Sequence, residues 1–342
     1  MSDFPLFIHG HGSVSSAGLD SLSLYRAVVG NAEVPAATLE RSLDVKTISY
    51  LHRPVDAGAL KGVMPKHPRL RRASNVTKFA VTAAYQAIGP ERLERMKNRE
   101  LNIGIIVSSM NGCVNYSNRF FEEVLSDPSF ASPILFPETV FNAPASHIAA
   151  FLDCEGPVYT LIGDSATWFS AVSVAEDWIS AGLVDGCLIL CAEEIDWLTL
   201  EALSLYSRDL IASEGAAAIY VEANPSDISI QCLNGPHPYT DATERRAAMS
   251  DAFPAETDIT GLLIDGLNGA ARLDHDEAAV LSSWTGPRLS PARVLGEGMG
   301  IRCGFQTITA IEALRDSHDS ATVFASGGNQ HAFSARLTRH SL

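Results

Sequence analysis

The stretch GPVYTLIGDSATWFSAVSVAEDWISAGLVDGCLILCAEE, residues 156–194, contains three successive structural elements. Residues 156–163 have the composition of a strand, residues 165–182 have helical apolar spacing and end at Gly182, and residues 184–194 form a buried apolar run. A strand, a helix and a second strand in this order predict two parallel strands covered on both faces. The fold class is therefore predicted to be α/β.

Ser165 stands where the first strand gives way to the helix, directly after Gly163 and Asp164. Its hydroxyl is either a nucleophile at the head of the helix or the N-cap that satisfies the first free amides. The sequence favours the N-cap. Trp168 and Phe169 follow at helical positions, where large side chains fill a core more often than they line a pocket.

The flanking sequence continues the alternation of strands and helices. Strands are predicted within residues 5–18, 101–112 and 214–223, and a helix is predicted from Ser74, its N-cap, to Gly89, its stop. A polar passage, residues 224–258, is predicted to separate two lobes. Beyond it we expect a strand and turn in residues 259–269, a helix in 304–316, and a strand, glycine turn and strand in 322–337.

Composition limits the classes of function. The chain has 342 residues, 46% hydrophobic, which is enough for one large domain or two lobes. No apolar run approaches a membrane span and the N-terminus lacks signal-peptide features, so a cytoplasmic location is expected. A formal net charge of −15 argues against nucleic acid binding and membrane insertion.

One basic segment opposes this acidic balance. It predicts either a docking site for an acidic partner or a solvated loop, and the sequence does not decide between them. Its residues are Lys61, Lys66, Arg69, Arg71, Arg72 and Lys78.

The cysteines and histidines give no sign of a metal centre or a bound cofactor. The six cysteines lack metal-type spacing and are interpreted as buried free thiols. His9 and His11 are interpreted as structural, and His275 and His331 as surface or supporting residues. No metal and no cofactor is expected.

Several motifs, in this order, resemble the β-ketoacyl synthases of the thiolase superfamily. Residues 156–160 and Ser165 are similar to the strand and nucleophile elbow of that family, with serine in place of its cysteine. Residues 132–150 resemble the stretch upstream of the elbow, residues 207–222 the Glu-Gly-Ala segment with Glu214 in place, and residues 325–332 the terminal Gly-Phe-Gly-Gly turn.

The resemblance implies a thiolase-like five-layer α-β-α-β-α fold made of two halves related by a pseudo-twofold axis. Residues 1–225 would form the half with the elbow and residues 226–342 a shortened C-terminal half, together making one compact unit. The family dimerises across an edge strand, which we expect here at residues 102–114.

A condensing enzyme of this family needs a thiolate and two imidazoles, and the matching positions lack all three. Ser165 stands at the cysteine, Asp265 at the first histidine, and Glu297 or Gly298 at the second, depending on the register, with Arg293 at the lysine. In the terminal turn, Ser326 replaces the gating phenylalanine before Gly327 and Gly328. A carboxylate at Asp265 about 5 Å from a malonyl carboxylate would cost about 3 kcal/mol at an effective dielectric near 20.

The resemblance therefore points to a chain-length-factor subunit without condensing activity. Such a subunit pairs with a cysteine-bearing ketosynthase, and the basic segment would dock an acyl carrier protein. Two alternatives stay open: an acyltransferase or thioester hydrolase that uses Ser165 as nucleophile, and a protein that only binds a lipid or polyketide in the remaining tunnel.

Overall fold

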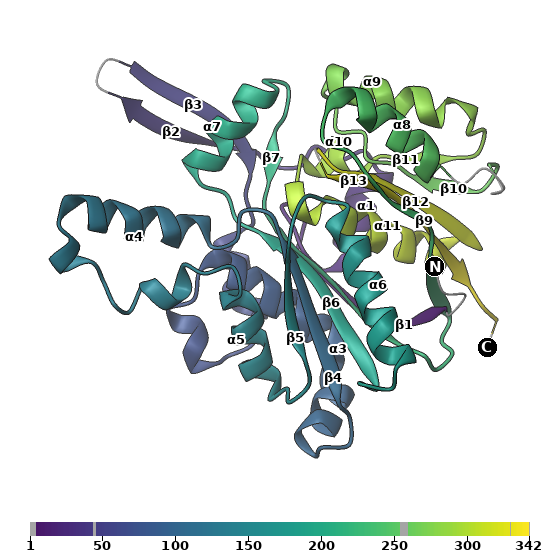
Figure 1. Ribbon diagram of the computed structural model, residues 1–342, viewed down its shortest axis with the longest axis horizontal. Coiled ribbons are helices and arrows are strands. Elements are labelled where there is room, and N and C mark those ends of the chain that lie inside the picture. The colour runs from purple at the N-terminus through teal and green to yellow at the C-terminus, as the bar shows by residue number, and fades with distance from the viewer. Residues whose placement is uncertain (1–4, 44–45, 254–258, 329, 342) are drawn as a thin grey trace.

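The structure, a computed structural model, describes residues 5–43, 46–253, 259–328 and 330–341. Within them, ten strands form one sheet in the order β11-β10-β12-β13-β9-β1-β8-β6-β4-β5 (Figure 1). Their bounds are β1 Leu6–Val14, β4 Ile103–Ser109, β5 Val158–Ile162, β6 Gly186–Glu193, β8 Gly215–Glu222, β9 Ile228–Pro238, β10 Leu262–Ile264, β11 Arg288–Leu289, β12 Ser320–Ser326 and β13 His331–Arg339.

The sheet contains the same five-strand unit twice. In one half β1 is antiparallel to β8 and β8 to β6, while β4 is parallel to both β6 and β5. In the other half β9, β13, β12, β10 and β11 repeat these orientations in the same order. The two units join where β1 pairs with β9 through Leu6–Ile230 and Phe7–Ser229. The second unit is the shorter one, because β10 and β11 have only 3 and 2 residues.

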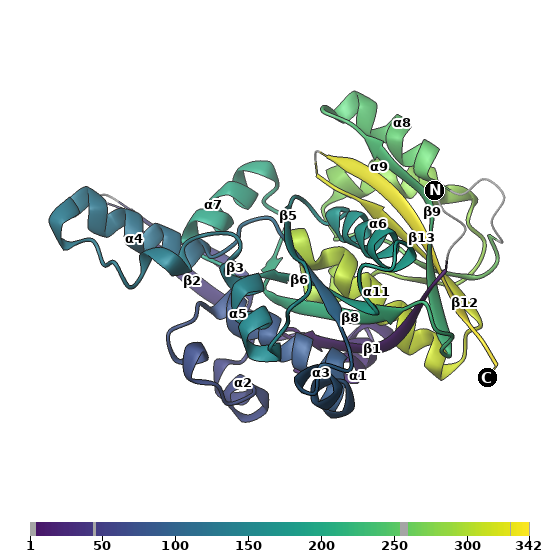
Figure 2. The same ribbon diagram turned by 60° about the horizontal axis from the view of Figure 1, so that its bottom comes forward.

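The two halves of the sheet and the helices that cover their faces stack in five layers. On the first half, Leu188 and Ala218 face α3 and α5, whereas the alternate residues Ile189 and Ile219 share a core with α6 and α11. The second half packs one face on α6 and α11 and the other on α8 and α9. Figure 2 shows α6 and α11 between the two halves. The predicted thiolase-like α-β-α-β-α fold is confirmed.

The helix bounds are α1 Ser21–Val29, α2 Ala57–Val63, α3 Asn75–Lys97, α4 Val114–Ser126, α5 Ala143–Leu152, α6 Thr167–Ser180, α7 Trp197–Tyr206, α8 Ala242–Ala252, α9 Ala271–Val280, α10 Pro291–Leu295 and α11 Arg302–Asp316. Short 3₁₀ turns occupy Pro68–Arg71, Pro128–Phe130, Phe136–Glu138, Leu281–Ser283 and Met299–Ile301.

A small second sheet supports α7. The hairpin of β2 (Ala37–Leu43) and β3 (Lys46–Arg53) is joined by β7 (Ala212–Ser213). The Arg41 guanidinium lies 3.5 Å from the ring centre of Trp197, and it forms an ion pair with Glu201. These contacts hold α7 against the hairpin of the small sheet.

Helix α3 corrects one sequence prediction in part. Ser74 is its N-cap, because its hydroxyl accepts from the Thr77 amide at 3.3 Å. The chain leaves helical geometry at Gly89, with φ 71°, but a further helical segment runs from Pro90 to Lys97. Proline is well suited to the first turn of a helix, so the glycine ends one helical segment and the next begins at once.

The polar passage of residues 224–258 was wrongly predicted to be a separator. Its described part contains β9 and α8, and β9 lies at the centre of the sheet. Only the beginning of β9 is fully buried and α8 buries few apolar side chains, so neither element gives a strong periodic signal. The predicted boundary between residues 225 and 226 falls between β8 and β9, and the division into two units there stays a prediction.

The expected dimer edge at residues 102–114 was also wrong. β4 lies between β6 and β5, is buried along its whole length, and therefore has no free edge. A fully buried apolar run is typical of a central parallel strand. β5 is the edge strand of this half, and Val158, Tyr159 and Ile162 on it are exposed.

Candidate functional site

Ser165 is buried at the turn between β5 and α6, but it is not the N-cap of α6. The helix begins at Thr167, and the cap position, Ala166, has no side chain able to hydrogen-bond. The Ser165 hydroxyl instead donates to the carbonyl of Ser326 at 3.3 Å and accepts from Nη2 of Arg302 at 2.9 Å. The N-cap interpretation was therefore wrong, because the tertiary partners of the hydroxyl lie on other elements.

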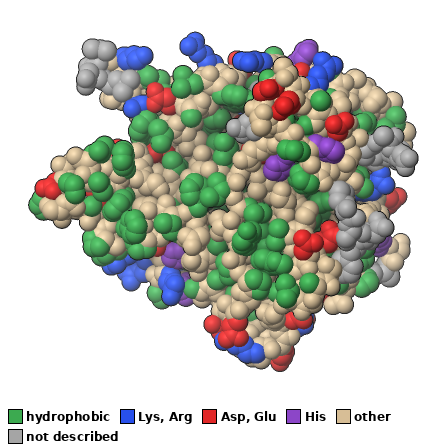
Figure 3. All heavy atoms as spheres, in the orientation of Figure 1, with side chains coloured by type: hydrophobic (Ala, Val, Ile, Leu, Met, Phe, Trp, Pro, Cys, Tyr) green, Lys and Arg blue, Asp and Glu red, His purple; other side chains and the backbone are tan. Residues whose placement is uncertain are grey.

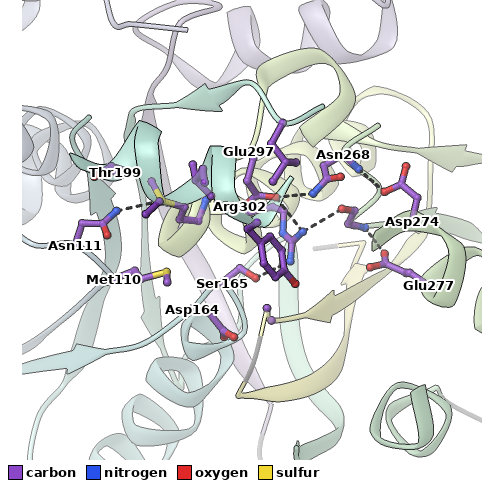
Figure 4. Close-up of a pocket in the computed structure, with 18 of the residues that line it drawn as sticks. Met110, Asn111, Asp164, Ser165, Thr199, Asn268, Asp274, Glu277, Glu297 and Arg302 are labelled. Atoms are coloured by element: carbon purple, nitrogen blue, oxygen red, sulfur yellow. Dashed lines mark hydrogen bonds and ion pairs between the residues drawn. The ribbon is translucent and has the colours of Figure 1, made fainter. Parts of the chain in front are cut away.

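Arg302, the first residue of α11, connects four segments that are distant in sequence. Its guanidinium donates to the Ser165 hydroxyl and the Ser326 carbonyl, to the Gly266 carbonyl at 3.2 Å, and to Oε2 of Glu297 at 3.2 Å. Figure 4 shows this side chain between Ser165 and Glu297. These are the segments in which the sequence placed the elbow, the two histidine positions and the terminal turn.

The charge of Arg302 is balanced within the site. Burial opposes the charged form, but the carboxylates of Glu297 and Glu277 outweigh it and raise the pKa of Arg302. Glu297 is fixed in turn by the Asn268 amide at 2.8 Å and by the Met299 backbone amide at 2.8 Å. Arg302 was not among the predicted site residues, although one charge in the apolar run MGIRCGF indicates a buried, paired side chain.

Glu277 is the second acidic group of this network. It accepts from the Gly266 amide at 2.6 Å and from the Ser326 hydroxyl at 2.8 Å. Burial raises the pKa of Glu277, while Arg302 acts in the opposite direction. No sequence motif pointed to Glu277, because it becomes part of the site only when α9 packs beside the end of β12.

The terminal turn reaches the site through its backbone and its first side chain. Ser326 binds Arg302 and Ser165 through its carbonyl and Glu277 through its hydroxyl. A Cβ at Gly327 would lie 1.8 Å from Oδ2 of Asp164, so this position requires glycine. Gly328 has open space around the corresponding position.

Asp265 lies beside the site and is not one of the residues that line the cavity. Its Oδ1 accepts from the Leu267 amide at 3.2 Å, and the side chain is buried at the end of β10. Burial and the neighbouring Glu277 carboxylate raise the pKa of Asp265 to about 7.

Of the two residues proposed for the second histidine position, Glu297 lines the cavity and Gly298 does not. Arg293 is exposed and pairs with Asp274 at 3.3 Å.

The site opens into one cavity of about 290 Å³, which we call the central cavity. One side is formed by the polar network around Arg302, and the other is largely apolar and comes from α7, the loop that follows it and the end of β4. Its lining residues are Met110, Asn111, Asp164, Ser165, Thr199, Ala202, Leu203, Tyr206, Leu210, Arg245, Gly266, Asn268, Asp274, Glu277, Glu297, Met299, Arg302, Gly327 and Gly328. This lining includes neither a thiol nor an imidazole.

The thiols and the histidines singled out in the sequence lie elsewhere. All six cysteines are free and five are buried, and burial raises the pKa of Cys303, next to Arg302, to about 12. His9 bonds to the Asn224 carbonyl and His11 to Ser21, and burial with the Arg315 charge lowers the pKa of His11 to about 3. His275 is exposed, and His331 lies 3.4 Å from the Ser170 hydroxyl.

Trp168 and Phe169 are fully buried in the core shared by the two halves. They do not line the central cavity, as their predicted place in the core requires.

Two surfaces outside the cavity are distinctive. Around α2 and the following 3₁₀ turn, Lys61, Lys66, Arg69, Arg71 and Arg72 are exposed, and Lys78 is half-buried. A second surface is apolar, and Figure 3 shows its hydrophobic side chains gathered over the region of α4. We call it the β5–α4 face; its exposed apolar residues are Phe121, Leu125, Phe130, Ile134, Phe136, Val140, Phe141, Val158, Tyr159 and Ile162.

Membrane-spanning helices and metal-binding clusters are both absent from the described residues. None of their helices has the length and apolar character needed to cross a membrane. They also contain no group of three or more side chains suited to hold a metal ion.

Comparison with known proteins identifies the fold. Residues 43–219 match the family described as "Beta-ketoacyl synthase, N-terminal domain". No curated protein matches the chain. Among solved structures, the ishigamide ketosynthase/chain length factor superposes with a TM-score of 0.81 at 17% identity, covering 98% of this chain and 100% of the other.

Two other structures are similar over almost the whole chain. A ketosynthase in complex with its chain length factor from Xenorhabdus doucetiae has a TM-score of 0.76 at 16% identity, covering 98% of each chain. A type II polyketide synthase acyl carrier protein in complex with its ketosynthase bound to the hexaketide has a TM-score of 0.75 at 13% identity, covering 98% of this chain and 99% of the other. At these identities the likeness is one of fold.

Proposed function

The chain belongs to the β-ketoacyl synthase family, and on that premise we propose that it is a chain-length-factor-like subunit without condensing activity. It pairs with a second, cysteine-bearing ketosynthase in polyketide or fatty-acid-like biosynthesis. The observation that carries the proposal is the Arg302 guanidinium, which binds Ser165, Gly266, Glu297 and Ser326 together. The position between the elbow and the terminal turn is thus filled by a side chain of the protein itself.

This arrangement opposes condensation in two ways. The guanidinium of Arg302 has only hydrogen-bond donors and stays positively charged. It therefore has no lone pair with which to accept a proton. Neither of the two neighbouring carboxylates, Glu297 and Glu277, replaces the hydrogen bonds that two imidazoles would donate to a developing enolate. A family member with this lining is expected to bind an acyl chain without extending it.

The alternative that Ser165 acts as a nucleophile lacks a general base. Among the described residues, the partners of its hydroxyl are a guanidinium, a backbone carbonyl and the thiol of Cys303, whose pKa burial raises to about 12. None of these groups takes a proton from serine at neutral pH. The Nε2 atom of His331 lies within hydrogen-bond distance of the Ser170 hydroxyl, and His331 does not line the cavity. We therefore favour the partner role over an acyltransferase or thioester hydrolase.

The β5–α4 face is suited to the partner subunit. An exposed apolar edge strand pairs readily with another strand, and a contiguous apolar surface of this kind marks a protein interface. Two of the similar structures are named as a ketosynthase with a chain length factor. We propose that β5 pairs with the matching edge strand of the ketosynthase.

The basic segment, Lys61 to Lys78, is proposed to dock an acyl carrier protein. Its cations lie on the surface of a chain whose net charge is −15, so they form a local site for an acidic partner. One similar structure contains an acyl carrier protein bound to its ketosynthase.

Co-expression with the cysteine-bearing ketosynthase encoded nearest to this gene tests the pairing. We expect the two chains to co-purify in equal amounts, and Tyr159→Asp on β5 to abolish the complex. Leu22→Asp, an exposed apolar position on α1, is the control and should leave the complex intact. Purification of this chain as a homodimer that extends malonyl thioesters would overturn the proposal.

Intact-mass measurement after incubation with acyl thioesters separates the alternatives. An acyl adduct that disappears in Ser165→Ala would favour the serine enzyme. The partner role predicts no adduct on this chain and an adduct on the ketosynthase.

A further inference from the structure

A second guanidinium, that of Arg245, borders the central cavity. It projects from α8 in the second half of the chain and lines the cavity together with Glu277, Gly327 and Gly328. Only 7% of the residue is exposed. Arg302 is part of the polar network on which the proposed function rests, whereas Arg245 is not a member of that network.

Arg245 differs from Arg302 in having no ion-pair partner in contact, although Glu277 interacts with it electrostatically at longer range and the Tyr239 side chain hydrogen-bonds to it. No ion pair among the described residues includes it, and its Nε has no hydrogen-bond partner. Arg302, by contrast, pairs with Glu297 in the same cavity. A buried guanidinium without a counter-charge is costly, because arginine does not neutralise itself by losing its proton.

The acidic side chains nearby are held by other groups. Glu297 binds Arg302 and Asn268, and Glu277 accepts from Gly266 and Ser326. Asp274 accepts from the amides of residues 268 and 269 and pairs with Arg293. Asp164 also lines the cavity, and its carboxylate packs against Gly327.

The opposite wall of the cavity is apolar. Leu203 and Tyr206 from α7, Leu210 from the loop after it, and Met110 and Met299 face the same space. A molecule that fills this space therefore meets a hydrocarbon surface along its body and, at one end, a buried guanidinium that has no ion-pair partner in contact. A cavity of about 290 Å³ is of the size that encloses a small, mostly apolar ligand.

We propose that the central cavity binds an apolar carboxylic acid, aliphatic or aromatic, with its carboxylate on Arg245. The planar guanidinium matches a carboxylate in charge and shape, and a charge-assisted pair in a water-poor site is stronger than a neutral hydrogen bond. The hydrocarbon part of the acid lies against α7. This inference concerns ligand binding by the chain and does not depend on the proposed pairing with a ketosynthase.

Calorimetric titration of the full-length chain with sodium octanoate and with octanamide tests the site. The two probes share a hydrocarbon chain and differ in charge. We expect octanoate to bind at least tenfold more tightly than octanamide and its affinity to fall as salt is added. Arg245→Met should remove the preference for the acid while octanamide binds as before.

Two further variants complete the test. Arg246→Met, at the exposed neighbouring position, should keep the full preference for octanoate. Arg245→Lys keeps the charge and should retain part of the preference, which guards against a folding defect in Arg245→Met. Equal affinities for the two probes, a preference that survives Arg245→Met, or no binding of either probe would each overturn the assignment.

Discussion

The guanidinium of Arg302 and the carboxylate of Glu297 form an ion pair of 3.2 Å in which each side chain is only 9% exposed. The pair is joined to Ser165 on one side and Asn268 on the other. It therefore links the first residue of α11 to the elbow at the start of α6. Removing one member of a buried pair of this kind strongly destabilises the folded protein, since the other member is left as an unpaired charge.

Arg302→Met is expected to lower the free energy of unfolding by about 3–5 kcal/mol. Glu297 would remain buried without its counter-charge, and the carbonyls of Gly266 and Ser326 would lose a donor. Arg293→Met is the matched control, because its pair with Asp274 is half-exposed and contributes about 1 kcal/mol or less. Urea denaturation followed by circular dichroism measures both, and equal effects would show that the buried network does not hold the site together.

Ser165→Cys is not expected to restore condensation. The family's reaction also needs two imidazoles, and the lining of the cavity contains none. The introduced thiol would lie beside Arg302, so its pKa should fall and it should react with iodoacetamide faster than the native thiols, among which burial raises the pKa of Cys303 to about 12. Release of carbon dioxide from malonyl thioester by the purified variant would contradict this prediction.

Glu193→Gln should flatten the dependence of stability on pH. Burial raises the pKa of Glu193 to about 8, from a usual value of 4.5, so the fold favours the protonated carboxyl. Its contribution is fully present below about pH 4.5 and is lost as the pH rises toward 8.

Between pH 6 and pH 8 the variant is therefore expected to lose on the order of 2 kcal/mol less stability than the wild type. Denaturant titrations at the two pH values measure the difference, with the exposed Glu91→Gln as the control. A wild-type stability that rises over this range in step with ionisation of Glu193 would refute the assignment.

Gly327→Ala should destabilise the protein, whereas Gly328→Ala should be nearly neutral. A Cβ at Gly327 meets the Asp164 carboxylate at 1.8 Å, while Gly328 has nothing within 4 Å. Displacing Asp164 would move the start of α6 and cost about 1–3 kcal/mol. Thermal unfolding of the two variants compares the positions directly, and similar melting temperatures would mean that the terminal turn shifts freely.

The elements predicted most accurately are those with continuous apolar runs. The strand, helix and strand of residues 156–194 lie where the pattern placed them. α6 buries one face and β6 its whole length, so both carry a strong apolar signal, whereas β5 is exposed and was recognised from its composition. β9 and α8 were missed because each is buried in part. The edge position of β5 was missed because local sequence does not specify the order of strands in a sheet.

The sequence by itself determined the α/β class, because apolar spacing acts locally along the chain. The repeated half and the serine at the elbow position followed from the resemblance of its motifs to the β-ketoacyl synthases. Only the tertiary structure decided what surrounds the Ser165 hydroxyl, because its partners Arg302 and Ser326 lie 137 and 161 residues away. The same holds for Arg245, whose lack of an ion-pair partner depends on how α8 packs against the cavity and on which carboxylates are already bound elsewhere.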